Sequence, residues 1–249
     1  MAAAPPKAMA PGAGPAIRIY TVLTRTLATK GRLAALGFLG LGSILLGLAV
    51  RLGHELDRAQ VAYSVVDGYG LALLVPVVAL VFASATLGDP AEDGTLVYLW
   101  LRPLPRWQLS VAALAAALSV TVPVAVIPVV IGAAVSGGGS GLIWASAAGS
   151  LLEAVAYSAV FCGLGLRVRR ALAWGLAYLL IWEQAVGRVS HGAARASLFI
   201  NARSLVAYIA DRPPPRNAVA PATAVILLLV VSGVAVLLTT RSLNRGEVT

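Results

Sequence analysis

Two glutamates stand inside long apolar stretches, where a carboxyl group has little water around it. Glu153 lies near the centre of the run 142–166. Glu183, followed by Gln184, lies in the second half of the run 171–187. A charge at the centre of a bilayer costs about 2.5–3.5 kcal/mol on insertion scales, so both side chains should face protein or water. They are candidates for lining a substrate path or for carrying a proton.

A purely structural role is the alternative for both residues. Burial favours the neutral form of a carboxyl group, and Glu153 could then hydrogen-bond to neighbours such as Ser150 or Ser158. Glu183 could instead reach the outer headgroups. Both interpretations stay open at this stage.

A second group of polar residues lies in "LGDPAEDGTLVYLWLRPLPRWQL", residues 87–109, between two apolar runs. It holds two arginines, three prolines and three acids: Asp89, Glu92 and Asp93. Acids followed by Gly94-Thr95-Leu96 favour a helix N-terminus. We expect a short helix along the membrane surface, ended by the prolines of "RPLPR".

The residues of enzymes and metal sites do not form recognisable sets here. No stretch fits a phosphate-binding loop, and no Ser/His/Asp or Cys/His set stands out. His54 and His191 have no cysteine or carboxylate at ligand spacing, and the single cysteine, Cys162, reads as a packing residue. We expect no catalytic residue, metal or cofactor in this chain.

The composition indicates that lipid, and not water, surrounds most of this chain. Of 249 residues, 59% are hydrophobic and 12% charged, with a mean hydropathy of +0.87, whereas soluble domains carry about 25% charged residues. Long apolar runs without strict alternation predict an all-α polytopic membrane protein. Six spans are expected, at about 33–50, 69–87, 109–135, 142–166, 171–187 and 218–240.

Prolines and glycines modify these spans. Pro123 and Pro128 should kink or split the third, and Pro76 the second. Glycines crowd the first span and predict close helix packing, within the subunit or at a subunit interface; they are Gly37, Gly40, Gly42 and Gly47.

The basic residues predict the orientation. With the N-terminus inside, inner segments carry twelve of the 19 lysines and arginines and outer segments seven, so both termini should be cytoplasmic. The net charge of +9 lies at the ends of apolar runs, as lipid-headgroup anchors would, and not in a nucleic-acid-binding patch. Residues 1–15 should be disordered and residues 241–249 a cytoplasmic tail.

Two flanking segments have helical periodicity. In residues 16–32, one face holds Ile17, Tyr20, Leu23, Thr24 and Leu27, which predicts an amphipathic helix on the cytoplasmic membrane surface. A disordered basic tail is the alternative. Residues 188–217 contain a second such face, which we expect to lie in the outer interface with its arginines on phosphates. Its members are Leu198, Ala202, Leu205, Val206 and Ile209.

The loop resembles the first cytoplasmic loop of the permease subunits of ABC type-2 transporters. That family has an acid before Gly-Thr-Leu, a proline nine residues after the glycine and an arginine twelve residues after it. The matching positions here are Asp93, Gly94, Thr95, Leu96, Pro103 and Arg106. The six spans and both amphipathic segments also look like the family. Many members carry Gly-Lys soon after the arginine, and "WQLSVAALAAA" lacks it, so a role for that lysine does not transfer.

The resemblance implies an exporter in a bacterial cytoplasmic membrane. Two permeases, identical or homologous, would pair, and each would bind a cytoplasmic ATPase at a coupling loop spanning residues 88–108. ATP and Mg²⁺ would stay on the ATPase. The substrate would be drug-like, lipid-like or a glycan carrier. Two alternatives remain: a permease-like subunit that works on another protein without transporting, and a proton-coupled transporter using Glu153 and Glu183.

Overall fold

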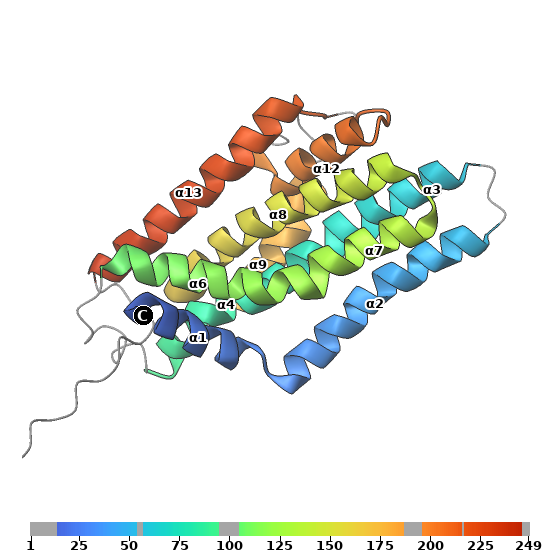
Figure 1. The fold of residues 1–249 in the computed structure, drawn as a ribbon. Helices are drawn as coiled ribbons and strands as arrows, with labels where there is room; N and C mark the ends of the chain where they lie inside the picture. Colours follow the sequence, from blue (N-terminus) through green and yellow to red (C-terminus); the bar gives the residue numbers. More distant parts are fainter. Residues whose placement is uncertain (1–13, 54–56, 95–104, 187–195, 216, 246–249) are drawn as a thin grey trace, which may run out of the picture.

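Long antiparallel helices make up most of the molecule, which was analysed as a computed structural model (Figure 1). The structure describes residues 14–53, 57–94, 105–186, 196–215 and 217–245, and every regular element there is a helix. The long elements are α2 (Lys30–Leu52), α3 (Arg58–Val65) running through the π-helical segment η1 (Val66–Leu74) into α4 (Val75–Glu92), α6 (Arg106–Thr121) running through η2 (Val122–Val126) into α7 (Ile127–Ser136), α8 (Ser140–Arg167) and α13 (Pro221–Arg245).

Five of these continuous helices are long and apolar enough to cross a membrane: 30–52, 58–92, 106–136, 140–167 and 221–245. The all-α polytopic prediction is confirmed to that extent. The run predicted as a fifth span, 171–187, begins as α9 (Ala171–Ala177) and continues as η3 (Tyr178–Val186), where this described segment ends. The total of six spans therefore stays a prediction.

The prolines modify the long helices where they were expected to. Pro123 lies in η2, and Pro128 follows it directly at the start of α7. The π-helical η1 likewise ends just before Pro76 in the first turn of α4. A proline supplies no N–H to the helical ladder and its ring crowds the preceding turn, so wider turns accommodate it. In Figure 1 the helix 106–136 bends between α6 and α7.

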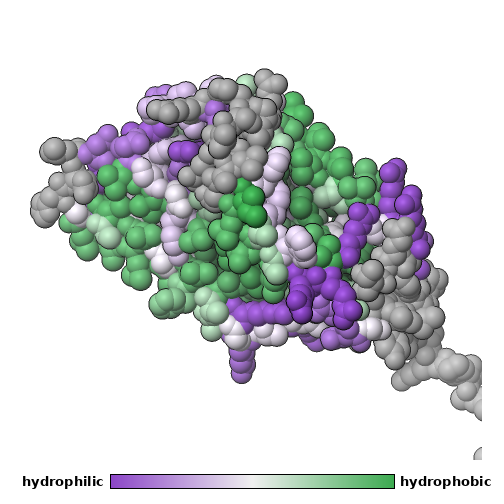
Figure 2. Space-filling model, turned by 180° about the vertical axis from the view of Figure 1, so that it is seen from behind, coloured by the Kyte–Doolittle hydropathy of each residue, from purple (hydrophilic) through white to green (hydrophobic). Residues whose placement is uncertain are grey.

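The bundle has two ends that differ in charge. We call the loop end the one where α4 ends at Glu92, α6 begins at Arg106 and α8 ends at Arg167. The far end is where α3 begins at Arg58 and α8 begins at Ser140. Ten of the described lysines and arginines belong to the loop end, against three acids. Among the described residues, the far end has three arginines, two of them exposed, and two acids. Figure 2 shows a broad hydrophobic flank with hydrophilic residues gathered toward the ends.

The N-terminal helix α1 (Pro15–Leu27) lies crosswise over the loop end and packs against α6 and α4 (Figure 1). Its buried face holds Ile19, Leu23 and Leu27, whereas Ile17, expected on that face, is 55% exposed. The helix also ends at Leu27, so residues 30–32, expected in an interfacial helix, open α2 instead. Its place on a membrane surface stays a prediction. The C-terminal helix α13 likewise extends to Arg245, through most of the expected tail.

The second amphipathic segment differs from the prediction. The helix α12 (Leu198–Ile209) is buried on nearly all sides between α8 and α13. A helix lying in the membrane interface would instead keep one face exposed. Polar side chains on the face opposite the predicted apolar one, including Asn201 and Ser204, are buried as well. Its Arg203 pairs with an acid of the bundle, described below, and not with the outer interface that was expected.

Small residues bring the helix backbones close together. A Cβ on Gly47 would overlap the carbonyl of Gly132 in α7, and a Cβ on Gly165 would overlap the carbonyl oxygen of Ser84 in α4. A Cβ on Gly37 would meet no atom within 4 Å. The glycines at 40 and 42 also face neighbours of the same chain, so most of the first span's glycines serve packing within the subunit.

Substituting two glycines of α2 should therefore have opposite effects. Gly47→Ala should lower the free energy of unfolding by about 1–3 kcal/mol, because the added methyl forces α2 and α7 apart. Gly37→Ala is the matched control and should raise it by up to about 1 kcal/mol through helix propensity. Thermal unfolding of both variants in one detergent tests this; equal effects would contradict the close contact.

Candidate functional site

The predicted coupling loop begins with acids that the structure places in the last turn of α4, not in a separate element. Asp89 Oδ2 accepts a hydrogen bond from Arg32 Nη1 of α2 at 2.9 Å. Glu92 Oε1 accepts one from the backbone N–H of Arg170 at 3.5 Å. Asp89 and Glu92 thus belong to the end of α4, and the helix expected after them falls outside the described residues. They close the long helix that begins at Arg58 and attach it to its neighbours.

Gly94 ends this helix for a clear physical reason. Its φ is +66°, in the left-handed region, and its N–H donates to the carbonyl of Ala91 at 3.3 Å. Residues with a Cβ adopt that conformation at a cost, which explains a glycine directly after the exposed Asp93. Thr95, Leu96 and Pro103, and the short surface helix expected there, lie outside the described residues. Arg106 opens α6 at the same end of the bundle.

Glu183 accepts several hydrogen bonds that its neighbours in the sequence did not reveal. It is 1% exposed and lies in η3, one π turn after Tyr178, whose hydroxyl donates to Oε1 at 2.9 Å. Ser197 Oγ donates to Oε2, and the backbone N–H of Leu198 donates to Oε1 at 3.1 Å. The carboxyl group therefore holds the N-terminus of α12, where a negative charge is favourable. It does not reach the headgroups. Gln184 follows it in η3.

Glu153 is the opposite case. It is fully buried in α8, and among the described residues neither carboxyl oxygen has a hydrogen-bond partner. The expected bonds to Ser150 and Ser158 are absent: Ser150 donates to the carbonyl of Ser146, and Ser158 Oγ has no partner within the described part. A buried carboxyl without a partner is costly. Glu153 thus remains a candidate for a functional role that its packing does not explain.

A partly buried ion pair near these acids was not predicted from the sequence. Arg203 Nε of α12 lies 2.9 Å from Asp67 Oδ1 of η1, with side-chain exposures of 32% and 13%. Asp67 falls just before the apolar run 69–87, so a window on hydropathy leaves it out, although the helix includes it. A lone acid among apolar residues, "SVVDGYG", was the available signal. Arg203 was assigned to phosphates because its helix was expected in the interface.

The ion pair borders a cavity of about 530 Å³. Asp67 and Arg203 supply its charges. Apolar side chains of η1, α4, α9, η3 and α12 supply most of the rest of its wall, among them Leu73, Val77, Leu176 and Leu180. Beside it, Trp174, Leu180 and Ile181 are each at least 60% exposed. A wall of this composition suits a molecule with both an apolar body and a polar group.

The two glutamates should respond differently to the same substitution. Glu183→Gln should lower the free energy of unfolding by about 1–3 kcal/mol, because an amide accepts these hydrogen bonds less well than a carboxylate. Glu153→Gln should leave stability unchanged or raise it, since no hydrogen bond is lost. Unfolding of both variants in the same detergent measures the difference, and equal destabilisation would contradict the assignment.

Comparison with known proteins gives one family. A family model described as ABC-2 family transporter protein (ABC2_membrane_4) matches residues 30–173, which is more than half of the chain. The match covers α2 through the start of α9, including the end of α4 and the start of α6. A search of curated proteins gave no match.

Proposed function

The chain belongs to the ABC-2 transporter family, and on that premise we propose that it is the transmembrane permease subunit of an ATP-binding-cassette exporter. It pairs with a second permease and with two cytoplasmic ATPase subunits. The complex moves an amphipathic, drug-like or lipid-like substrate outward across a bacterial cytoplasmic membrane. ATP and Mg²⁺ act on the ATPase subunits, and this chain contributes no catalytic residue.

The observation that carries the proposal is the construction of the loop end. The exposed Asp93 and the acid Glu92 close α4 at the same end where α6 begins with Arg106. Because α3, η1 and α4 form one helix from Arg58 to Glu92, a force applied at these acids acts on Asp67 deep in the bundle. A charged tip on a long helix is a suitable point for a soluble partner to bias a two-state bundle.

The excess of basic residues supports a cytoplasmic loop end. Lysine and arginine predominate on the inner side of membrane proteins, and most of the described ones belong to this end. Helix α1 and the end of α13 lie there too, which agrees with cytoplasmic termini (Figure 1). In a six-span chain, residues 171–187 cross the membrane as the fifth span.

The cavity beside Asp67 and Arg203 favours a transporting permease. The alternative, a subunit that transmits the work of the ATPase without moving a substrate, has no need of such a cavity. The exposed side chains Trp174, Leu180 and Ile181 lie next to the cavity. In the proposed complex, the second permease packs on them and closes the path. The proton-coupled alternative is less suited to these contacts, because Glu183 is engaged in holding α12.

Removing the negative charges of the tip should weaken binding of the ATPase. In pull-downs from native membranes, Glu92→Gln with Asp93→Asn should lower the ratio of ATPase to permease by between about two-fold and thirty-fold, as expected for two exposed ion pairs.

The matched control removes two acids from the far end, Asp57→Asn with Asp211→Asn. Asparagine keeps the cap at position 57 and the positive φ at position 211. This pair should leave the ratio unchanged. If no ATPase co-purifies with the wild type, or if both pairs of substitutions act equally, the proposed docking is wrong.

A further inference from the structure

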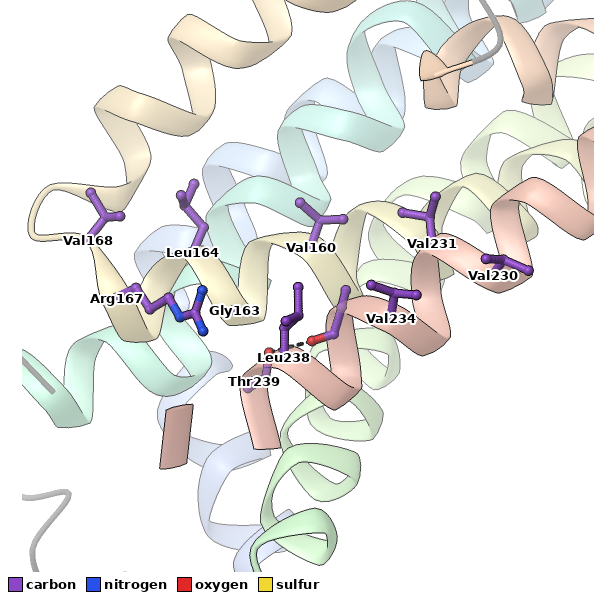
Figure 3. A pocket seen from close by; sticks show the side chains of 11 residues that line it. Val160, Gly163, Leu164, Arg167, Val168, Val230, Val231, Val234, Leu238 and Thr239 are labelled. Carbon is purple, nitrogen blue, oxygen red and sulfur yellow. Dashed lines mark hydrogen bonds between the residues drawn. The ribbon is translucent and has the colours of Figure 1, made fainter. Parts of the chain in front are cut away.

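A groove between α8 and α13 lies away from the cavity described above, toward the loop end (Figure 3). Its volume is about 530 Å³. Val160 and Leu164 of α8 form one side and Val231 and Val234 of α13 the other. The hydroxyl of Thr239, a polar member of the wall, donates to the carbonyl of Ala235 in its own helix. Most of the groove therefore offers apolar contact to its occupant.

Arg167 closes the groove at the loop end (Figure 3). Of the described residues that line the groove, Arg167 alone carries a charge. Its Nε donates to Ser242 Oγ of α13 at 2.6 Å, which fixes the guanidinium across the gap between the two helices. Arg169, Arg170 and Arg241 are exposed at the same end. Positive charge is thus concentrated at one end of an apolar groove.

The dimensions match one leaflet of a bilayer. From Val230 to Leu238 the groove follows α13 for about 12 Å, within half of a hydrocarbon core about 30 Å thick. The side chains of Val230, Val234 and Leu238 are 53%, 48% and 43% exposed, so the groove opens sideways toward lipid. An acyl chain could enter it from the bilayer without crossing a polar barrier.

We propose that this groove binds one anionic phospholipid, with an acyl chain between α8 and α13 and the phosphate on Arg167. Basic pockets between membrane helices bind anionic headgroups by charge and hydrogen bonding. The residues of α8 and α13 that face each other are mostly small or β-branched, so they leave a gap between the two helices. The lipid fills this gap and joins the helices. It is a resident lipid and not the transported substrate, and its binding does not depend on the ATPase.

The experiment is a lipid titration of the detergent-purified full chain, followed by native mass spectrometry. Dioleoylphosphatidylglycerol should bind in preference to dioleoylphosphatidylcholine. Arg167→Ala should lower phosphatidylglycerol binding about five-fold, the effect expected for one basic residue near a headgroup, and lower phosphatidylcholine binding less, because its choline offsets the charge of the phosphate. Val234→Phe should lower the binding of both lipids by roughly ten-fold or more, because it occupies the space of several methylenes.

Matched variants separate the site from general charge and packing. Arg25→Ala removes an exposed arginine of the same end, and Ile226→Phe adds a ring to an exposed position of α13 outside the groove. Neither should change binding. Arg167→Lys should keep most of the phosphatidylglycerol preference, because it keeps the charge.

Several results would overturn the proposal. Equal losses in Arg25→Ala and Arg167→Ala would show an unspecific charge effect, and unchanged binding in Val234→Phe would place the lipid elsewhere. Binding of inorganic phosphate as tight as that of phosphatidylglycerol would show an anion site without an acyl chain. A cross-link between two copies carrying Val234→Cys would make the groove a protein interface. Release of the lipid during ATP turnover by the assembled complex would make it a substrate.

Discussion

The close approach of α4 and α8 is the contact on which the other features depend. Apolar side chains gain little from moving out of lipid into a helix interface, so close packing of small residues has to hold membrane helices together. Gly165 of α8 lies against Ser84 of α4, and a Cβ on Gly88 would be 3.1 Å from the carbonyl oxygen of Gly165. Side chains cannot fill this interface, and the two backbones therefore behave as one unit.

The chemistry of the chain is distributed along these two helices. The helix ending in α4 carries Asp67 in its first third and Glu92 at its tip, while α8 carries Glu153 in its centre and Arg167 at its end. Asp67 links the helix 58–92 to Arg203 of α12. Glu183 in turn holds the N-terminus of α12. In the proposed transporter, movement at the loop end thus has a continuous path to the cavity bordered by the ion pair.

The sequence predicted well those features that depend on composition over many residues. Hydropathy located the long helices, and Pro76, Pro123 and Pro128 marked their irregular turns, because both signals are local. The acid-Gly-Thr-Leu pattern pointed to a family that the comparison confirmed. The reason for its glycine became clear only from the positive φ at Gly94.

Features that depend on distant partners could not be predicted. The periodicity of α12 is the same for a helix on a membrane surface and for one packed in a bundle, so its burial and the pairing of Arg203 with Asp67 were missed. The bond between Arg32 and Asp89 joins residues 57 positions apart, and no local pattern announces it. For Glu153 the nearby serines were plausible partners by spacing, yet helix geometry directs Ser150 to its own backbone.

The central claim is that a cytoplasmic ATPase binds where α4 ends. The most direct test is cross-linking in native membranes from a single introduced cysteine, with the buried Cys162 as background. We predict that Asp93→Cys forms an adduct with the ATPase and that Asp57→Cys, at the far end, does not. An adduct from Asp57→Cys, or none from Asp93→Cys while the ATPase is bound, would contradict the account.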